Sequence, residues 1–77
     1  MIKYKNLSGN SGITHYRTAE DQIHVKFKGR DAIYVYSDKV TGKSHVKKMK
    51  TLAEKGVGLG TYISQHPKVK NGFTTIE

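Results

Sequence analysis

The chain has 77 residues, with 14 Lys and Arg against 6 Asp and Glu, and it contains no cysteine. A chain this short builds one core, which excludes a doubly wound nucleotide fold, and the lack of cysteine excludes disulfides, thiolate zinc sites and cysteine nucleophiles. The formal net charge of +8 favours an acidic partner, such as nucleic acid or an acidic protein.

The first residues form a short basic lead without the apolar run of a signal peptide, and residues 8–12 form a turn-rich cluster. No stretch of about 18 apolar residues is present to span a bilayer. We therefore expect one cytoplasmic domain over residues 1–77 that does not bind membranes, with a core at about 10–66 and basic, flexible ends.

Three strands are predicted, at residues 13–17, 22–28 and 32–36. The second shows strict alternation, with apolar side chains at Ile23, Val25 and Phe27. A short turn at 29–31 and a polar turn at 18–21 predict antiparallel pairing of all three strands.

Alternation also predicts the two faces of this sheet. Ile33 and Val35 are expected to face the helices together with the apolar residues of the second strand. The opposite face is then open, and it is expected to display His24, Lys26, Lys28, Tyr34 and Tyr36.

Two helices are predicted after the strands. In the first, which begins near Thr41 or Ser44 and ends at Gly56, apolar residues recur at helical spacing at Val46, Met49, Leu52 and Ala53. The second contains Leu59, Tyr62, Ile63 and His66, and Pro67 ends it. The expected fold is α+β in the order βββαα, a small antiparallel three-stranded sheet with two helices packed on one face.

Two short motifs resemble nucleotide-binding loops. Residues 37–44 end in Gly-Lys-Ser like a phosphate-binding loop, but Ser37 occupies the position of its first glycine. The glycines at 56, 58 and 60 follow a helix rather than a strand, which is wrong for a dinucleotide-binding fold. We interpret the first motif as a loop capping a helix and the second as a turn between helices.

Residues suited to catalysis or metal binding are scattered. The four histidines have no cysteines and few carboxylates to complete a metal site, and neither a pair of acids nor a Ser, His and Asp set occurs at recognisable spacing. We therefore expect a protein that is not an enzyme and has no metal, cofactor or small-molecule substrate.

Basic residues are concentrated in the second half, where eight lysines lie between residues 39 and 70 with Glu54 as the only acid. On a helical wheel Lys43, Lys47 and Lys50 form one stripe away from the apolar face. Such lysines contact phosphates and exposed tyrosines stack on bases, so the predicted nucleic-acid site comprises Lys26, Lys28, Tyr34, Tyr36, Lys43, Lys47 and Lys50. Lysine also simply solvates helices, and tyrosine also simply favours strands.

Residues 10–66 resemble the KTSC domain family, a short module found at the C-terminus of some lysyl-tRNA synthetases and as free-standing bacterial and phage proteins. The resemblance rests on residues 10–13, residues 23–27, the Tyr34-Val35-Tyr36 element, Leu52-Ala53 with Gly56, and Leu59 with Ile63. The sequence departs from the family at Val40-Thr41, where Val-Pro is frequent, and at Gly60, where Asn is frequent.

The family has no assigned molecular function, but its attachment to a tRNA synthetase implies RNA. Charge and resemblance together predict a nucleic-acid-binding module, with RNA preferred to DNA. The alternative is a protein-interaction or phage/host regulatory module that binds an acidic protein.

Overall fold

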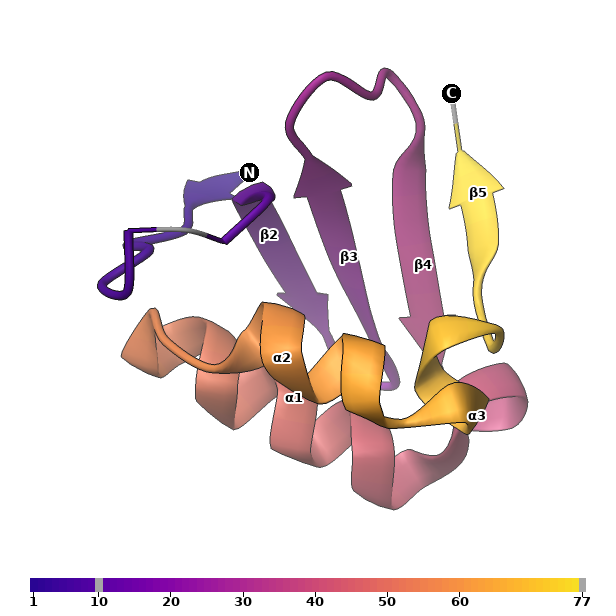
Figure 1. The fold of residues 1–77 in the computed structure, drawn as a ribbon. Helices are drawn as coiled ribbons and strands as arrows, with labels where there is room; N and C mark the ends of the chain where they lie inside the picture. Colours follow the sequence, from indigo (N-terminus) through magenta and orange to yellow (C-terminus); the bar gives the residue numbers. More distant parts are fainter. Residues whose placement is uncertain (10, 77) are drawn as a thin grey trace.

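The computed structural model describes residues 1–9 and 11–76, which form a sheet with helices on one face (Figure 1). The sheet is antiparallel, and its five strands follow one another in chain order. They are β1 (Ile2–Lys3), β2 (Ile13–Ala19), β3 (Gln22–Phe27), β4 (Ile33–Ser37) and β5 (Thr74–Ile76). Between β4 and β5 lie a π-helical turn, η1 (Asp38–Gly42), and the helices α1 (Lys43–Lys55), α2 (Leu59–Gln65) and α3 (Pro67–Lys70).

The α+β class is confirmed, but the prediction of a three-stranded sheet is wrong. Two further strands, β1 and β5, form the edges of the sheet, on either side of the three that were predicted. Their two and three residues are too few to show alternation, and β5 pairs with β4 only after the whole helical layer. Pro67 follows the end of α2, as expected, and occupies the first position of α3.

The core lies between the helices and one face of the sheet. Ile23 and Val25 are fully buried there, which confirms the predicted inner face of β3. On α1 the predicted apolar side is buried at Val46, Met49 and Ala53, and Gly56 ends the helix in the left-handed conformation, as expected.

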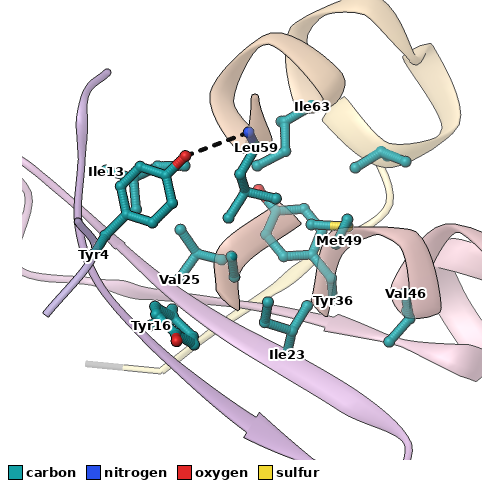
Figure 2. Close-up of a cluster of buried hydrophobic side chains, with 12 residues drawn as sticks. Tyr4, Ile13, Tyr16, Ile23, Val25, Tyr36, Val46, Met49, Leu59 and Ile63 are labelled. Atoms are coloured by element: carbon teal, nitrogen blue, oxygen red, sulfur yellow. Dashed lines mark hydrogen bonds between the residues drawn. The ribbon is translucent and has the colours of Figure 1, made fainter. Parts of the chain in front are cut away.

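The predicted orientation of β4 is wrong. Tyr36 pairs directly with Ile23, so its side chain shares the helix side of the sheet, and only 2% of it is exposed. Figure 2 shows its ring inside the buried cluster. Tyr34 pairs with Val25 and is partly buried on the same side, whereas Ile33 and Val35 face the opposite way.

Size explains this inversion. In an Ile-Tyr-Val-Tyr strand both sets of side chains are apolar, so alternation alone does not identify the inner one. A tyrosine ring buries far more surface than a valine, and the two rings fill the space between β4 and the helices. Val35, paired with His24 and Thr74, is shielded on the other face by its neighbours.

A bulge in β2 brings two residues of opposite parity to the same face. Ile13 and Tyr16 are three positions apart, yet both belong to the core. The register shifts between Ile13 and His15, which leaves Thr14 as the extra residue, and its hydroxyl donates to the Lys26 carbonyl at 3.2 Å. His15 and Arg17 are thereby directed to the open face.

No helix within residues 1–9 and 11–76 has the length and apolar character to cross a bilayer.

Candidate nucleic-acid interface

The seven predicted site residues do not form one surface. Tyr34 and Tyr36 lie on the helix side of the sheet, Lys26 lies on the open side, and Lys28 is exposed in the turn that follows β3. Lys43, Lys47 and Lys50 lie on α1 in the other layer. The predicted combination of open-face tyrosines with Lys26 and Lys28 is therefore wrong, because the rings of β4 point into the core.

The open face of the sheet contains a different basic set, arranged in two cross-strand rows. In the first row, Lys3 pairs with His15, and His15 pairs with Lys26. In the second, Arg17 pairs with His24. Directly paired residues project to the same side of a sheet, so these five side chains form one surface, which we call the basic face (Lys3, His15, Arg17, His24 and Lys26).

Carboxylates are absent from this side of the described sheet. The remaining open-side positions of the paired strands are neutral: Ala19, Gln22, Ile33, Val35, Ser37, Thr74 and Ile76. Lys3 and Arg17 are exposed, and His15, His24 and Lys26 are partly exposed. The positive potential of the basic face is thus not compensated by an acid within the same rows.

His24 is the titratable group most affected by this environment. Burial, and to a smaller extent the positive charge of Arg17, lowers its pKa below the usual value of a histidine. Its Nε2 lies 3.2 Å from Oε1 of Gln22. An anion bound beside Arg17 would offset both causes and favour the protonated imidazole.

The lysine stripe of α1 is less uniform than the helical wheel predicted. Lys50 is partly buried, and its ammonium group donates to the carbonyl oxygens of Ala19 and Glu20 in the turn between β2 and β3. Lys43 and Lys47 are exposed, but the hollow beside them is also lined by Glu20 and Asp38. Lys50 therefore connects α1 to the sheet layer, and the carboxylates of Glu20 and Asp38 reduce the positive potential of Lys43 and Lys47.

Tyr34 and Tyr36 belong to a second feature, an aromatic pocket of about 260 Å³ on the helix side near β5. Four rings line it, those of Phe27, Tyr34, Tyr36 and Phe73. The remaining lining residues are Ile63, Arg30 and Lys70.

The two glycine-containing motifs form turns. Residues 38–42 are the π-helical turn η1, and the Ser37 hydroxyl caps it by accepting from the Val40 amide at 3.3 Å. Gly56 and Gly58 both have positive φ and join α1 to α2, as the interpretation of an interhelical turn requires. The first motif does lie between β4 and α1, but it forms a π-helical turn beside an antiparallel sheet rather than a phosphate-binding loop, and the second motif follows a helix.

No family model, curated protein or solved structure matches this chain. The resemblance to the KTSC family therefore stays a prediction, and its first residue, Asn10, lies outside the described residues.

Alternation correctly placed His24 and Lys26 on the open face, but Lys3, His15 and Arg17 were not predicted there. Alternation in residues 13–17 puts His15 and Arg17 on the same side as Ile13, and only the bulge at Thr14 separates them from this core residue and places them on the open face. Lys3 was missed because β1 has only two residues, too few to show alternation. The density of lysines between residues 39 and 70 instead favoured α1 as the phosphate-binding surface.

Proposed function

We propose that this chain is a nucleic-acid-binding module that contacts the phosphates of a single strand, RNA in preference to DNA, through the basic face. The supporting observation is the set of cross-strand rows Lys3-His15-Lys26 and Arg17-His24, which includes no acid. Single-strand binders track the backbone with such cationic surfaces, and the surplus of +8 speeds encounter with a polyanion. The preference for RNA rests on the KTSC resemblance.

The main contact with the phosphates then lies on the sheet rather than on α1. Side chains from three neighbouring strands are held by backbone pairing, so their spacing across the sheet is about 5 Å per strand. A single strand that crosses the rows can present successive phosphates to these side chains. The lysines of α1 add to the positive electrostatic potential that attracts the polyanion.

The test is a titration of fluorescently labelled 12-nucleotide RNA, DNA of the same sequence and a duplex, followed by anisotropy at several salt concentrations. If four phosphates are neutralised on a single strand, log K falls with log salt with a slope of about 3. The double substitution of Arg17→Gln with Lys26→Gln is expected to lower that slope by about 1.4 and to weaken binding to every sequence.

The matched control removes the same charge from α1, by Lys43→Gln with Lys47→Gln. This variant is expected to retain most of the salt dependence. Equal losses in the two double variants would show that only net charge matters and would overturn the assignment to the basic face. If the wild-type protein binds none of the three nucleic acids at low salt, the acidic protein partner becomes the leading function.

A further inference from the structure

The aromatic pocket has preformed walls. Tyr34 meets Phe27 edge to face, with ring centroids 5.1 Å apart, and meets Phe73 at 4.7 Å in a tilted arrangement. Phe73 follows Gly72, a buried residue whose carbonyl accepts a hydrogen bond from the buried Thr41 hydroxyl. The wall contributed by Phe73 is therefore tied to η1 rather than left to a free terminus.

Two cations border this apolar space. The Arg30 guanidinium donates to the Tyr34 hydroxyl at 3.0 Å, and Lys70 comes from the end of α3. Among the described residues that line the pocket, none is a carboxylate. Aromatic walls bordered by cations suit a molecule that combines a flat ring with an anionic group.

The volume restricts the size of that ring. Pockets for drug-sized ligands enclose about 300 to 1,000 Å³. The aromatic pocket, at about 260 Å³, is slightly smaller than this range and suits a single ring system. A nucleotide, which joins a flat base to an anionic phosphate through its sugar, has this combination of flatness and charge.

Arg30 also connects the pocket to the basic face. A shallow hollow beside the turn between β3 and β4 is lined by Arg30 together with His15, Lys26, Lys28 and the carboxylate of Asp31. Two residues of the basic face thus share a surface with the arginine at the pocket. A strand that lies on the basic face can continue around this turn, where the cations Lys26, Lys28 and Arg30 outnumber the single carboxylate of Asp31.

We propose that the aromatic pocket takes one unstacked nucleotide of the bound single strand, with its base against the partly exposed rings and its phosphate at Arg30 or Lys70. This inference rests on the proposed function, because the rest of the strand is held by the basic face. Stacking on aromatic side chains is sequence-tolerant, so the pocket would add affinity for single strands over duplex rather than select one base.

The experiment is an NMR titration of the isotope-labelled protein with hexauridylate and with a hexamer of the same backbone that lacks all bases. Hexauridylate is expected to give nuclear Overhauser contacts from uracil H5 and H6 to the rings of Phe73 and Tyr34. The abasic hexamer is expected to shift only resonances of the basic face and to bind about 5- to 150-fold more weakly.

Two variant pairs test the parts of the pocket. Phe73→Leu removes the aromatic wall and is expected to reduce affinity for hexauridylate to nearly that for the abasic hexamer, while Phe73→Tyr keeps it. Lys70→Gln removes a cation at the pocket, and Lys68→Gln is its matched control, because Lys68 is an exposed lysine of the same short helix that does not line the pocket. Circular dichroism and thermal melting confirm that each variant is folded.

The outcomes separate the two proposals. If hexauridylate binds and shifts only the basic face, or if Lys70→Gln and Lys68→Gln lower affinity equally, the pocket assignment is overturned and the proposed function stands. If hexauridylate does not bind at all, the proposed function fails and the pocket assignment fails with it. Contacts from uracil to Phe73 and Tyr34, together with a lower affinity for hexauridylate in Phe73→Leu, support both.

Discussion

The side chain of Lys50 joins the two layers of the protein. Its ammonium group donates to two carbonyl oxygens of the turn between β2 and β3. Lys50→Gln is expected to lower the free energy of unfolding by about 1 to 2 kcal/mol, because a hydrogen bond from a charged donor is lost and carbonyl oxygens are left without it. Urea denaturation measures this difference.

The control for this change is Lys47→Gln, one turn earlier on the same helix, where the side chain is exposed. Its effect on stability is expected to stay within about 0.5 kcal/mol. Equal stability of the two variants would mean that the contacts of Lys50 do not persist in solution.

The ionisation of Tyr36 is expected to lower the free energy of unfolding at alkaline pH. Burial, reinforced by the charge of Tyr34 when ionised, raises the pKa of Tyr36 to about 12. This folded-state pKa lies above the unfolded value of about 10. The stabilisation that comes from burying neutral Tyr36 is therefore complete below pH 10 and is lost as pH rises from 10 through 12. At pH 11 the loss amounts to about 1.4 kcal/mol.

The comparison that isolates this residue is Tyr36→Phe. Between pH 9 and 11 the variant is expected to lose less stability than the wild type, as measured by urea denaturation at each pH. A parallel decline in both proteins would place the alkaline sensitivity in other groups.

At the scale of elements, Gly56 links α1 to the N-terminal segment. Its φ of 78° is left-handed, an added Cβ would overlap the Cβ of Lys5, and its carbonyl accepts from the Leu7 amide at 2.8 Å. Gly56→Ala is expected to cost about 2 kcal/mol or more, since conformational strain and the overlap act together. The thermal midpoint reports this cost.

Gly12→Ala is the corresponding control. A Cβ at Gly12 meets nothing within 4 Å, and this glycine does not have a positive φ. Its midpoint is expected to remain close to that of the wild type. A wild-type-like midpoint for Gly56→Ala would contradict the close packing of Lys5 against the end of α1.

The elements also show what a single sequence can predict. The inner faces of β3 and α1 were predictable because apolar and charged residues alternate there with the period of the element. In β4 the competing faces were both apolar, so the outcome depended on which set filled the space under the helices. The size of the tyrosine rings and the space beneath the helices, rather than periodicity, determine which face of β4 is buried.

The same limit applies to the candidate sites. Lys26 was predictable from alternation, but its neighbours on the basic face come from strands whose register includes a bulge at Thr14. Tyr34 was predicted to stack on bases from the wrong side of the sheet. Tyr34 lines the aromatic pocket together with Phe73, which lies far from it in the sequence. The two rings meet only because the chain returns to the sheet at β5, directly after Phe73.

At the scale of the whole molecule, binding of a polyanion is expected to strengthen as pH falls. The lowered pKa of His24 keeps it neutral in the free protein near neutral pH, and in the absence of ligand this destabilises the fold as pH falls below about 6.5. A nearby phosphate favours the protonated form, so binding takes up a proton. Affinity for hexauridylate is therefore expected to rise between pH 7.5 and 5.5.

His24→Gln is expected to reduce this pH dependence, and His66→Gln, located at the junction of α2 and α3 rather than on the basic face, is expected to keep it. Isothermal titration in buffers of different ionisation enthalpy measures the proton uptake directly. Equal uptake in wild type and His24→Gln would exclude a role for this imidazole.

The pairing of β5 with β4 has a consequence for the order of folding. The hairpins of β2, β3 and β4 close over short turns, whereas Ile33 and Ile76 are separated in the sequence by the entire helical layer. Because closing a long loop costs more entropy than closing a short one, we expect the transition state for folding to contain the hairpins and to lack β5. Thr75→Gly should then mainly accelerate unfolding, while Thr18→Gly, in the first hairpin, should slow folding. Stopped-flow chevrons distinguish the two, and slower folding of Thr75→Gly would indicate that β5 docks early. Phe73 directly precedes β5, so a local opening of β5 that leaves the Thr41–Gly72 hydrogen bond intact is expected to loosen the aromatic pocket while the rest of the protein stays folded.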